Sequence, residues 1–96
     1  MKDLYTIVND NDEFIYLDLG EIKTDDRLPR RSTTFNDVDE AKGKIEKIKS
    51  NHQKKIEEYT DQLADPNAYH HEWMRYWLDN ETLPNMRVVK ITLTEL

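Results

Sequence analysis

Residues 35–64 read FNDVDEAKGKIEKIKSNHQKKIEEYTDQLA, and this stretch supplies the apolar face that can cover the strands elsewhere in the chain. Its apolar side chains recur three or four residues apart, which is the spacing of one face of an amphipathic helix. Asp37, three residues before Glu40, is a suitable N-cap for such a helix. The sequence therefore predicts a helix over 38–64, about 40 Å long at about 1.5 Å per residue. Its predicted apolar face consists of Val38, Ala41, Ile45, Ile48, Ile56, Tyr59 and Leu63.

Two segments rich in β-branched and aromatic residues precede the helix. Residues 4–8 and 14–19 predict the two strands of a β-hairpin, because residues 9–13 are Asn, Asp and Glu, most of which suit a tight loop. Side chains alternate along a strand, so Ile15, Leu17 and Leu19 share the face that needs a cover.

The segment between the hairpin and the helix is less regular. Gly20 closes the hairpin, and Pro29 with the paired charges of 21–34 argues against a regular central strand there. Residues 33–35 predict a short edge strand. A connection of this length in a small domain is often functional or mobile.

The chain after the long helix predicts a second helix and a final strand. Asp65-Pro66 stops the first helix and suits the start of another, because proline is tolerated at the first helical position. Residues 86–95 alternate apolar and polar, with Val89, Ile91 and Leu93 on one face. We therefore expect an α+β fold in a single domain, 1–96. Its antiparallel sheet has three to four strands, made of the N-terminal hairpin plus the C-terminal strand, and one long and one short helix pack on it.

Composition excludes several classes of protein. The chain has 96 residues, no cysteine and a net charge of −6. Without cysteine there are no disulfides, thiolate nucleophiles or Cys-ligated metals. No apolar run approaches the about 18 residues that a membrane span needs, and the first residues resemble no signal peptide. We expect a cytoplasmic protein that does not bind membranes.

Charge is distributed unevenly along the chain. Residues 1–40 carry 11 acidic and 5 basic side chains, whereas residues 41–60 carry six lysines against three glutamates. A basic middle between acidic flanks would allow pairing with a charged partner or with a second copy, but the simpler explanation is a Lys/Glu-rich helix face exposed to water. Direct nucleic-acid binding is not expected, because phosphate binding needs clustered positive charge.

Catalytic and metal-binding patterns are weak. His70 and His71 are adjacent and point about 100° apart on a helix, so they do not form a two-ligand metal pair. The Asp10–Glu21 segment resembles a calcium loop only in part, since Phe14 and Ile15 occupy positions that need an oxygen ligand and glycine. We expect no catalytic residue, no metal, no cofactor and no enzymatic activity.

Aromatic residues are numerous for a chain of this size. Tyr69, Trp73 and Trp77 recur every four residues, and Phe14 and Tyr16 lie on the hairpin. Trp and Tyr are enriched at binding hot spots, but Trp73 and Trp77 also suit a core between the two helices. Both interpretations stay open at this stage.

Three stretches resemble small accessory proteins encoded by bacteriophages of Gram-positive bacteria, anti-CRISPR proteins among them. The stretches are the hairpin (Tyr5–Val8 and Glu13–Leu17), Thr34–Ala41 and Val88–Leu93. The resemblance implies a role in host takeover or defence evasion inside the host bacterial cell. It assigns no functional residue.

The functional expectation is a non-enzymatic protein-binding module, an inhibitor of a bacterial nucleic-acid-handling defence enzyme such as a CRISPR effector nuclease. An acidic surface would occupy a cationic groove built for phosphates. The alternative is a homo-oligomeric structural or regulatory protein, a dimer paired through the 38–64 helix. The expected partner-binding residues are Asp10, Asp12, Glu13, Phe14, Tyr16, Asp18, Asp25 and Asp26.

Overall fold

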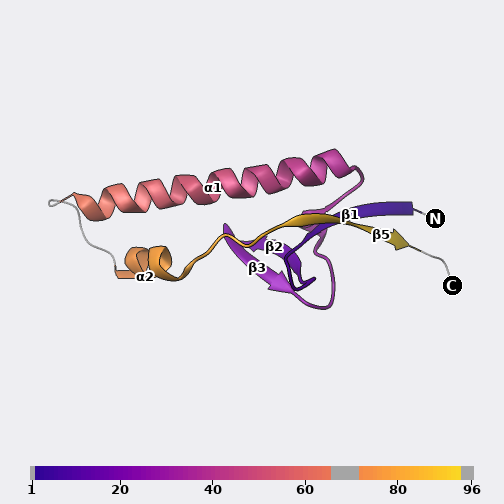
Figure 1. Cartoon of the computed structure of the whole chain (residues 1–96), viewed down its shortest axis with the longest axis horizontal. Helices are drawn as coiled ribbons and strands as arrows, with labels where there is room; N and C mark the ends of the chain where they lie inside the picture. Colours follow the sequence, from indigo (N-terminus) through magenta and orange to yellow (C-terminus); the bar gives the residue numbers. More distant parts are fainter. Residues whose placement is uncertain (1, 66–71, 94–96) are drawn as a thin grey trace. The chain divides into compact units, whose positions relative to one another are not determined.

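The computed structural model describes residues 2–65 and 72–93, and within them the fold is α+β, as the sequence predicts (Figure 1). Strands, two α-helices and a short 3-10 helix follow one another along the chain. In order they are β1 Lys2–Val8, β2 Phe14–Asp18, β3 Glu21–Asp25, η1 Arg31–Thr33, β4 Thr34–Phe35, α1 Val38–Ala64, α2 Glu72–Asn80 and β5 Arg87–Leu93.

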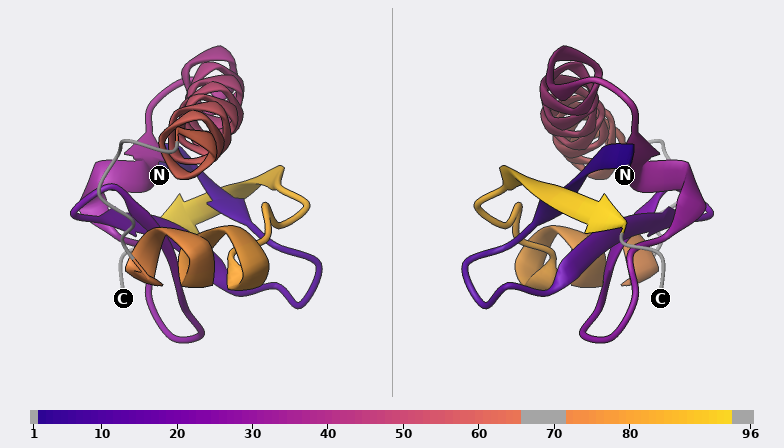
Figure 2. Two further views of the ribbon diagram at one scale, coloured as in Figure 1. Left: turned by 90° about the vertical axis from the view of Figure 1, so that its left-hand side faces the viewer. Right: turned by 90° about the vertical axis from the view of Figure 1, so that its right-hand side faces the viewer.

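Strand β1 is the centre of an antiparallel five-stranded sheet among the described residues. On one edge it pairs with β5 over seven residues, from Lys2 opposite Leu93 to Val8 opposite Arg87, so that β1 and β5 lie side by side (Figure 2). On the other edge it pairs with β4 and then, at Val8 opposite Phe14, with β2. The C-terminal strand is therefore integral to the sheet.

Strand β3 corrects the prediction for residues 21–34. Five residues, Glu21–Asp25, pair with the whole of β2, so the predicted three or four strands become five. Pro29 lies beyond this strand and does not interrupt it. The strand was missed because it is a mostly exposed edge, where charged residues are tolerated and no alternating apolar pattern is needed.

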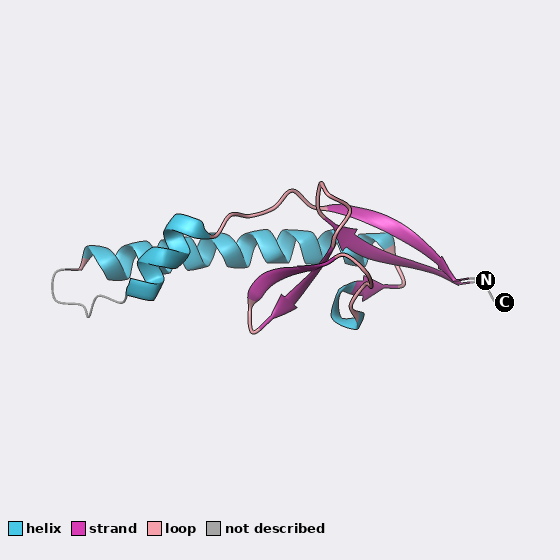
Figure 3. Ribbon diagram, turned by 90° about the horizontal axis from the view of Figure 1, so that it is seen from below, coloured by secondary structure: helices cyan, strands magenta, loops and turns pink. Residues whose placement is uncertain are grey.

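The β2–β3 hairpin (residues 14–25) also corrects the prediction that Leu19 belongs to the apolar face of a strand. The strand ends at Asp18, and Leu19 lies in the turn, almost fully exposed. Only Val8 and Phe14 join β1 to β2, so the hairpin diverges from the β1–β5 pair (Figure 3). The sheet thus presents a projecting two-stranded ribbon.

Two buried threonines fasten the base of this ribbon. The Thr6 hydroxyl donates to the backbone oxygen of Thr33 at 2.8 Å, and the Thr33 hydroxyl donates to the backbone oxygen of Ile15 at 2.8 Å. Thr6, Thr33, Ile7 and Ile15 are completely buried. Buried polar groups are tolerated when they are hydrogen-bonded, so this relay fixes β1, η1 and β2 to one another.

Helix α1 begins and ends as predicted. The Asp37 carboxylate accepts the N–H of Asp39 at 2.7 Å, which confirms Asp37 as the cap of the first turn. Ala41, Ile45 and Ile48 of the predicted apolar face are buried. The predicted start of the second helix at Asp65-Pro66 lies largely outside the described residues.

The chain divides into two compact units, which we describe separately. The sheet unit comprises residues 1–46 and 84–96, and the helical unit comprises residues 47–83. In the helical unit α2 runs back along the second half of α1, and Tyr59 meets the rings of Trp73 and Trp77 edge to face, with ring centres 5.3 Å apart in both pairs. Trp73 keeps 56% of its surface exposed, so it is not the core residue that the helical spacing suggested.

Candidate functional site

The loop between β1 and β2 is held by its first residue. The Asn9 side-chain oxygen accepts the N–H groups of Asn11 and Glu13, both at 3.0 Å, and its amide nitrogen donates to the Glu13 carboxylate at 2.9 Å. Asn and Asp side chains commonly stabilise turns by such bonds to nearby backbone. The Glu13 carboxylate, expected to bind a partner, is therefore already engaged within the loop.

The two aspartates of this loop contact the chain just before and at the start of β5. Asn85 donates to the Asp10 carboxylate at 2.9 Å, and Arg87 forms an ion pair with Asp12. Both contacts join residues 75 positions apart in the sequence. An exposed ion pair stabilises a fold only slightly, but it reduces the net negative charge that the loop presents to a partner.

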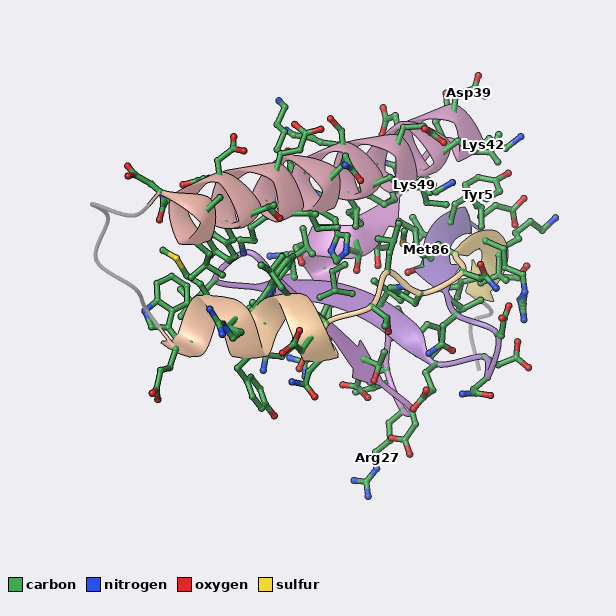
Figure 4. The ribbon with its side chains drawn as sticks, turned by 60° about the vertical axis from the view of Figure 1, so that its left-hand side comes forward. Tyr5, Arg27, Asp39, Lys42, Lys49 and Met86 are labelled. Carbon is green, nitrogen blue, oxygen red and sulfur yellow. The ribbon has the colours of Figure 1, made fainter. Side chains whose placement is uncertain are left out.

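The loop after β3 is organised by Asp25. Its carboxylate accepts the N–H groups of Arg27 at 2.8 Å and Leu28 at 3.2 Å, and its second oxygen lies 3.1 Å from the Arg30 guanidinium. Hydrogen bonds from the backbone N–H groups of Arg27 and Leu28 are the main cause that lowers the pKa of Asp25. Desolvation opposes them, and the Arg30 guanidinium adds a smaller lowering effect. Arg27 itself projects outward from this loop (Figure 4).

The aromatic residues of the hairpin, Phe14 and Tyr16, are partly covered by the rest of the sheet unit. Phe14 and Tyr16 are half-buried. The Arg30 guanidinium covers the Tyr16 ring, with its carbon 4.3 Å from the ring centre. Arg30 therefore bridges Tyr16 and Asp25, two residues predicted to bind a partner, and stabilises the hairpin through both.

In the turn between β2 and β3, Asp18 was predicted to bind a partner, whereas Leu19, Gly20 and Glu21 were not. We call residues 18–21 the hairpin tip. Asp18 and Glu21 are directly opposite each other, and the two residues between them have positive φ, 52° at Leu19 and 81° at Gly20. Positive φ at both central residues is the requirement of a type I′ turn, and a glycine two residues after a strand was the available signal.

Of the predicted acidic residues, Asp18 and Asp26 form no side-chain hydrogen bond or ion pair with any described residue. Asp18 lies at the tip and Asp26 just beyond the other end of β3. Four steps along β2 separate Asp18 from Phe14, the partner of Asp25, which is about 13 Å at about 3.3 Å per residue. The free carboxylates therefore lie at opposite ends of one hairpin.

The helical unit offers a second group of exposed rings. Trp77 lies near His52, with ring centres 5.1 Å apart, and the Lys55 ammonium is 5.5 Å from the Trp77 ring centre. Trp73 and Tyr76 are mostly exposed on α2. His70 and His71 lie outside the described residues, and no three metal-binding side chains gather in the part of the chain that is described.

Pairing of two copies through α1 stays a prediction. The exposed positions of the described helix are mainly charged or polar, and Val38, in its first turn, is its exposed large apolar residue. A helix that pairs with another copy needs an apolar stripe facing outward.

Comparison with known proteins gives no relative. No family model matches the chain, and no curated protein or solved structure matches it significantly. Neither of the two helices in the described part is long and apolar enough to cross a membrane. The function therefore has to be argued from the geometry of the hairpin.

Proposed function

We propose that this chain is a non-enzymatic binding module that acts in the cytoplasm of a bacterial host and inhibits a nucleic-acid-handling enzyme there. The β2–β3 hairpin enters a cationic groove of that enzyme. One observation carries the proposal: Asp18 and Asp26 are exposed at opposite ends of a hairpin whose base is fixed by buried hydrogen bonds. A groove built for phosphates attracts negative charges that are held in place at a distance from each other.

The other predicted acidic residues support this arrangement without meeting the partner. The side chains of Asp10, Asp12, Glu13 and Asp25 bond to neighbouring parts of the sheet unit. These bonds fix the two loops that flank the hairpin, which lowers the entropy lost on binding. The proposed surface is therefore smaller than the sequence suggests and more rigid.

The test compares charge reversal on the hairpin with matched reversal elsewhere. The partner is captured from a bacterial lysate, purified, and titrated with wild type, with D18K/D26K and with E58K/D61K. Glu58 and Asp61 are exposed on α1 in the helical unit, so the control changes the net charge equally.

We expect D18K/D26K to bind about tenfold or more weakly, mainly through slower association, while E58K/D61K binds like wild type. Wild-type affinity should fall as salt rises, because charges separated by more than about 8 Å are screened at physiological ionic strength. Equal binding by all three proteins with no salt dependence would exclude the groove proposal.

A further inference from the structure

Leu19 at the hairpin tip occupies a position that its own fold does not favour. Its φ of 52° lies in the left-handed region, where an L-residue with a side chain loses about 1–2 kcal/mol relative to an ordinary conformation. Type I′ turns place Asn, Asp or Gly at this position. The leucine is also 97% exposed, the largest fraction among the exposed large apolar residues of the described chain.

Neither cost is recovered inside the described sheet unit. With almost its whole surface in water, the Leu19 side chain gains no burial. An asparagine would satisfy the turn and remove the exposed apolar group. Non-glycine residues held in unfavourable backbone regions concentrate at functional sites, because there the cost is recovered on binding.

The residues beside Leu19 add a third unfavourable feature. Asp18 and Glu21 are exposed and face each other across the turn, and like charges directly opposite destabilise a strand pair. Lys23 relieves this in part, since its ammonium lies 3.6 Å from the Glu21 carboxylate. Both of those side chains are about half exposed, so solvent screens the pair.

We propose that Leu19 is the anchor by which the hairpin tip enters an apolar pocket on a protein partner, with Asp18 and Glu21 against basic side chains at the rim of that pocket. This inference rests on the proposed function and adds the point of entry. The occupant follows from charge complementarity: two carboxylates flank one apolar side chain, so the matching surface is an apolar pocket bordered by Lys or Arg.

The hairpin presents Leu19 in a defined position. Strands β2 and β3 are paired at all five positions up to the turn, and the Thr33 hydroxyl holds β2 at Ile15. A preorganised anchor loses little conformational freedom when it binds. Burial of one leucine side chain in the pocket corresponds to about 10- to 100-fold in affinity.

Four proteins test the proposal: wild type, L19N, L19M and L28N. Asparagine accepts the left-handed backbone but removes the apolar group, whereas methionine keeps an apolar side chain. Leu28 is the matched control, because it is also a loop leucine, is 68% exposed, and is not among the residues with positive φ. Each protein is measured by thermal unfolding and by titration of the purified partner captured with wild type.

We expect L19N to unfold about 4 °C or more above wild type and to bind about 10- to 100-fold more weakly. L19M should have the melting temperature of wild type and an affinity within a few-fold of it. L28N should bind like wild type without the gain in stability. A gain in stability together with a loss of binding is the result that a purely structural role of Leu19 does not produce.

Other outcomes overturn the inference and distinguish it from the proposed function. If L19N binds like wild type while salt still weakens the complex, Leu19 is not an anchor although the charged hairpin binds. If wild type retains no protein from the lysate, both proposals fail. Retention of only a second copy of the chain excludes the proposed class of partner. An unchanged melting temperature for L19N would contradict the claim that leucine is unfavourable at this position of the turn.

Discussion

The sheet unit and the helical unit are stabilised by different interactions. In the sheet unit, aliphatic residues and two threonines are completely buried, and the threonine hydroxyls bond to backbone oxygens across three elements. In the helical unit, partly exposed rings meet at centre distances of 5.1–5.3 Å around Trp77 and Tyr59. The hydrogen bonds of the sheet unit fix backbone positions, whereas the helical unit relies on contacts between rings that are partly exposed to solvent.

The difference is the reason why we place the proposed binding surface on the sheet unit. Directional hydrogen bonds between buried groups specify one geometry, because a buried donor or acceptor without a hydrogen-bond partner costs free energy. Ring contacts contribute about 0.5–1.5 kcal/mol each and accept several relative angles. The hairpin tip is attached to the first type of core, which is why we assign the anchor to it rather than to the exposed rings of α2.

The largest effect is expected for Ile15→Ala. Removing most of a completely buried side chain at the base of the hairpin should lower the free energy of unfolding by about 3 kcal/mol. Urea unfolding is followed by circular dichroism and by tryptophan fluorescence. Both tryptophans, Trp73 and Trp77, belong to the helical unit, so fluorescence reports on that unit alone.

The two signals test whether the units unfold together. Helix α1 continues from the sheet unit into the helical unit, so we expect both midpoints to fall by the same amount. A fluorescence midpoint that stays at the wild-type value would show that the helical unit unfolds independently. Leu28→Ala, at a mostly exposed position, is the control and should change stability by less than about 0.5 kcal/mol.

A smaller effect is expected for Trp77→Ala. Trp77 is half-buried and contacts Tyr59, His52 and Lys55, so its loss should destabilise the protein by about 2 kcal/mol. Trp73→Ala should cost less, because more than half of that side chain is exposed. Thermal unfolding followed by circular dichroism at 222 nm measures the stability of both variants. Equal losses of stability would contradict the prediction that the more buried ring contributes more.

The smallest effect is expected for Asp25→Asn and appears only as a change in pH dependence. The pKa of Asp25 is lower in the folded state than in the unfolded chain, so the carboxylate stabilises the fold above about pH 4 and this contribution is lost as pH falls through the folded pKa. Thermal unfolding between about pH 2 and 7 should show a flatter acid limb for the variant. Identical acid limbs would contradict the role of Asp25 in holding the loop.

Local patterns in the sequence predicted α1 and its cap at Asp37, because helix periodicity and capping depend on residues a few positions apart. The same holds for β1, β2 and β5. Strand β3 was missed because an exposed edge imposes little on composition. The partners of Asp10 and Asp12 were not predictable, since they depend on the register of β1 against a strand about 80 residues away.

For the candidate site, the sequence shows which residues are acidic but not which of their carboxylates are free to contact a partner. Asp10, Asp12, Glu13 and Asp25 look alike in the sequence, yet each bonds to a different part of the sheet unit. Leu19 was assigned to a strand because its alternation with Leu17 fits one, so the predicted strand ended one residue too late, at Leu19 instead of Asp18. The structure places Leu19 in the turn with a positive φ, where its side chain is almost fully exposed.

The position of β1 at the centre of the sheet has a consequence for synthesis on the ribosome. Its edge toward β5 is completed by residues 87–93, so about 80 residues have to be translated after β1 before that edge is covered. At a translation rate of about 5–20 residues per second, the backbone groups of β1 on its β5 side remain unpaired for roughly 4–16 s. During that interval β1 can pair with β2 and β4, and the β5 edge is the one on which a nascent chain is open to pairing with other extended chains.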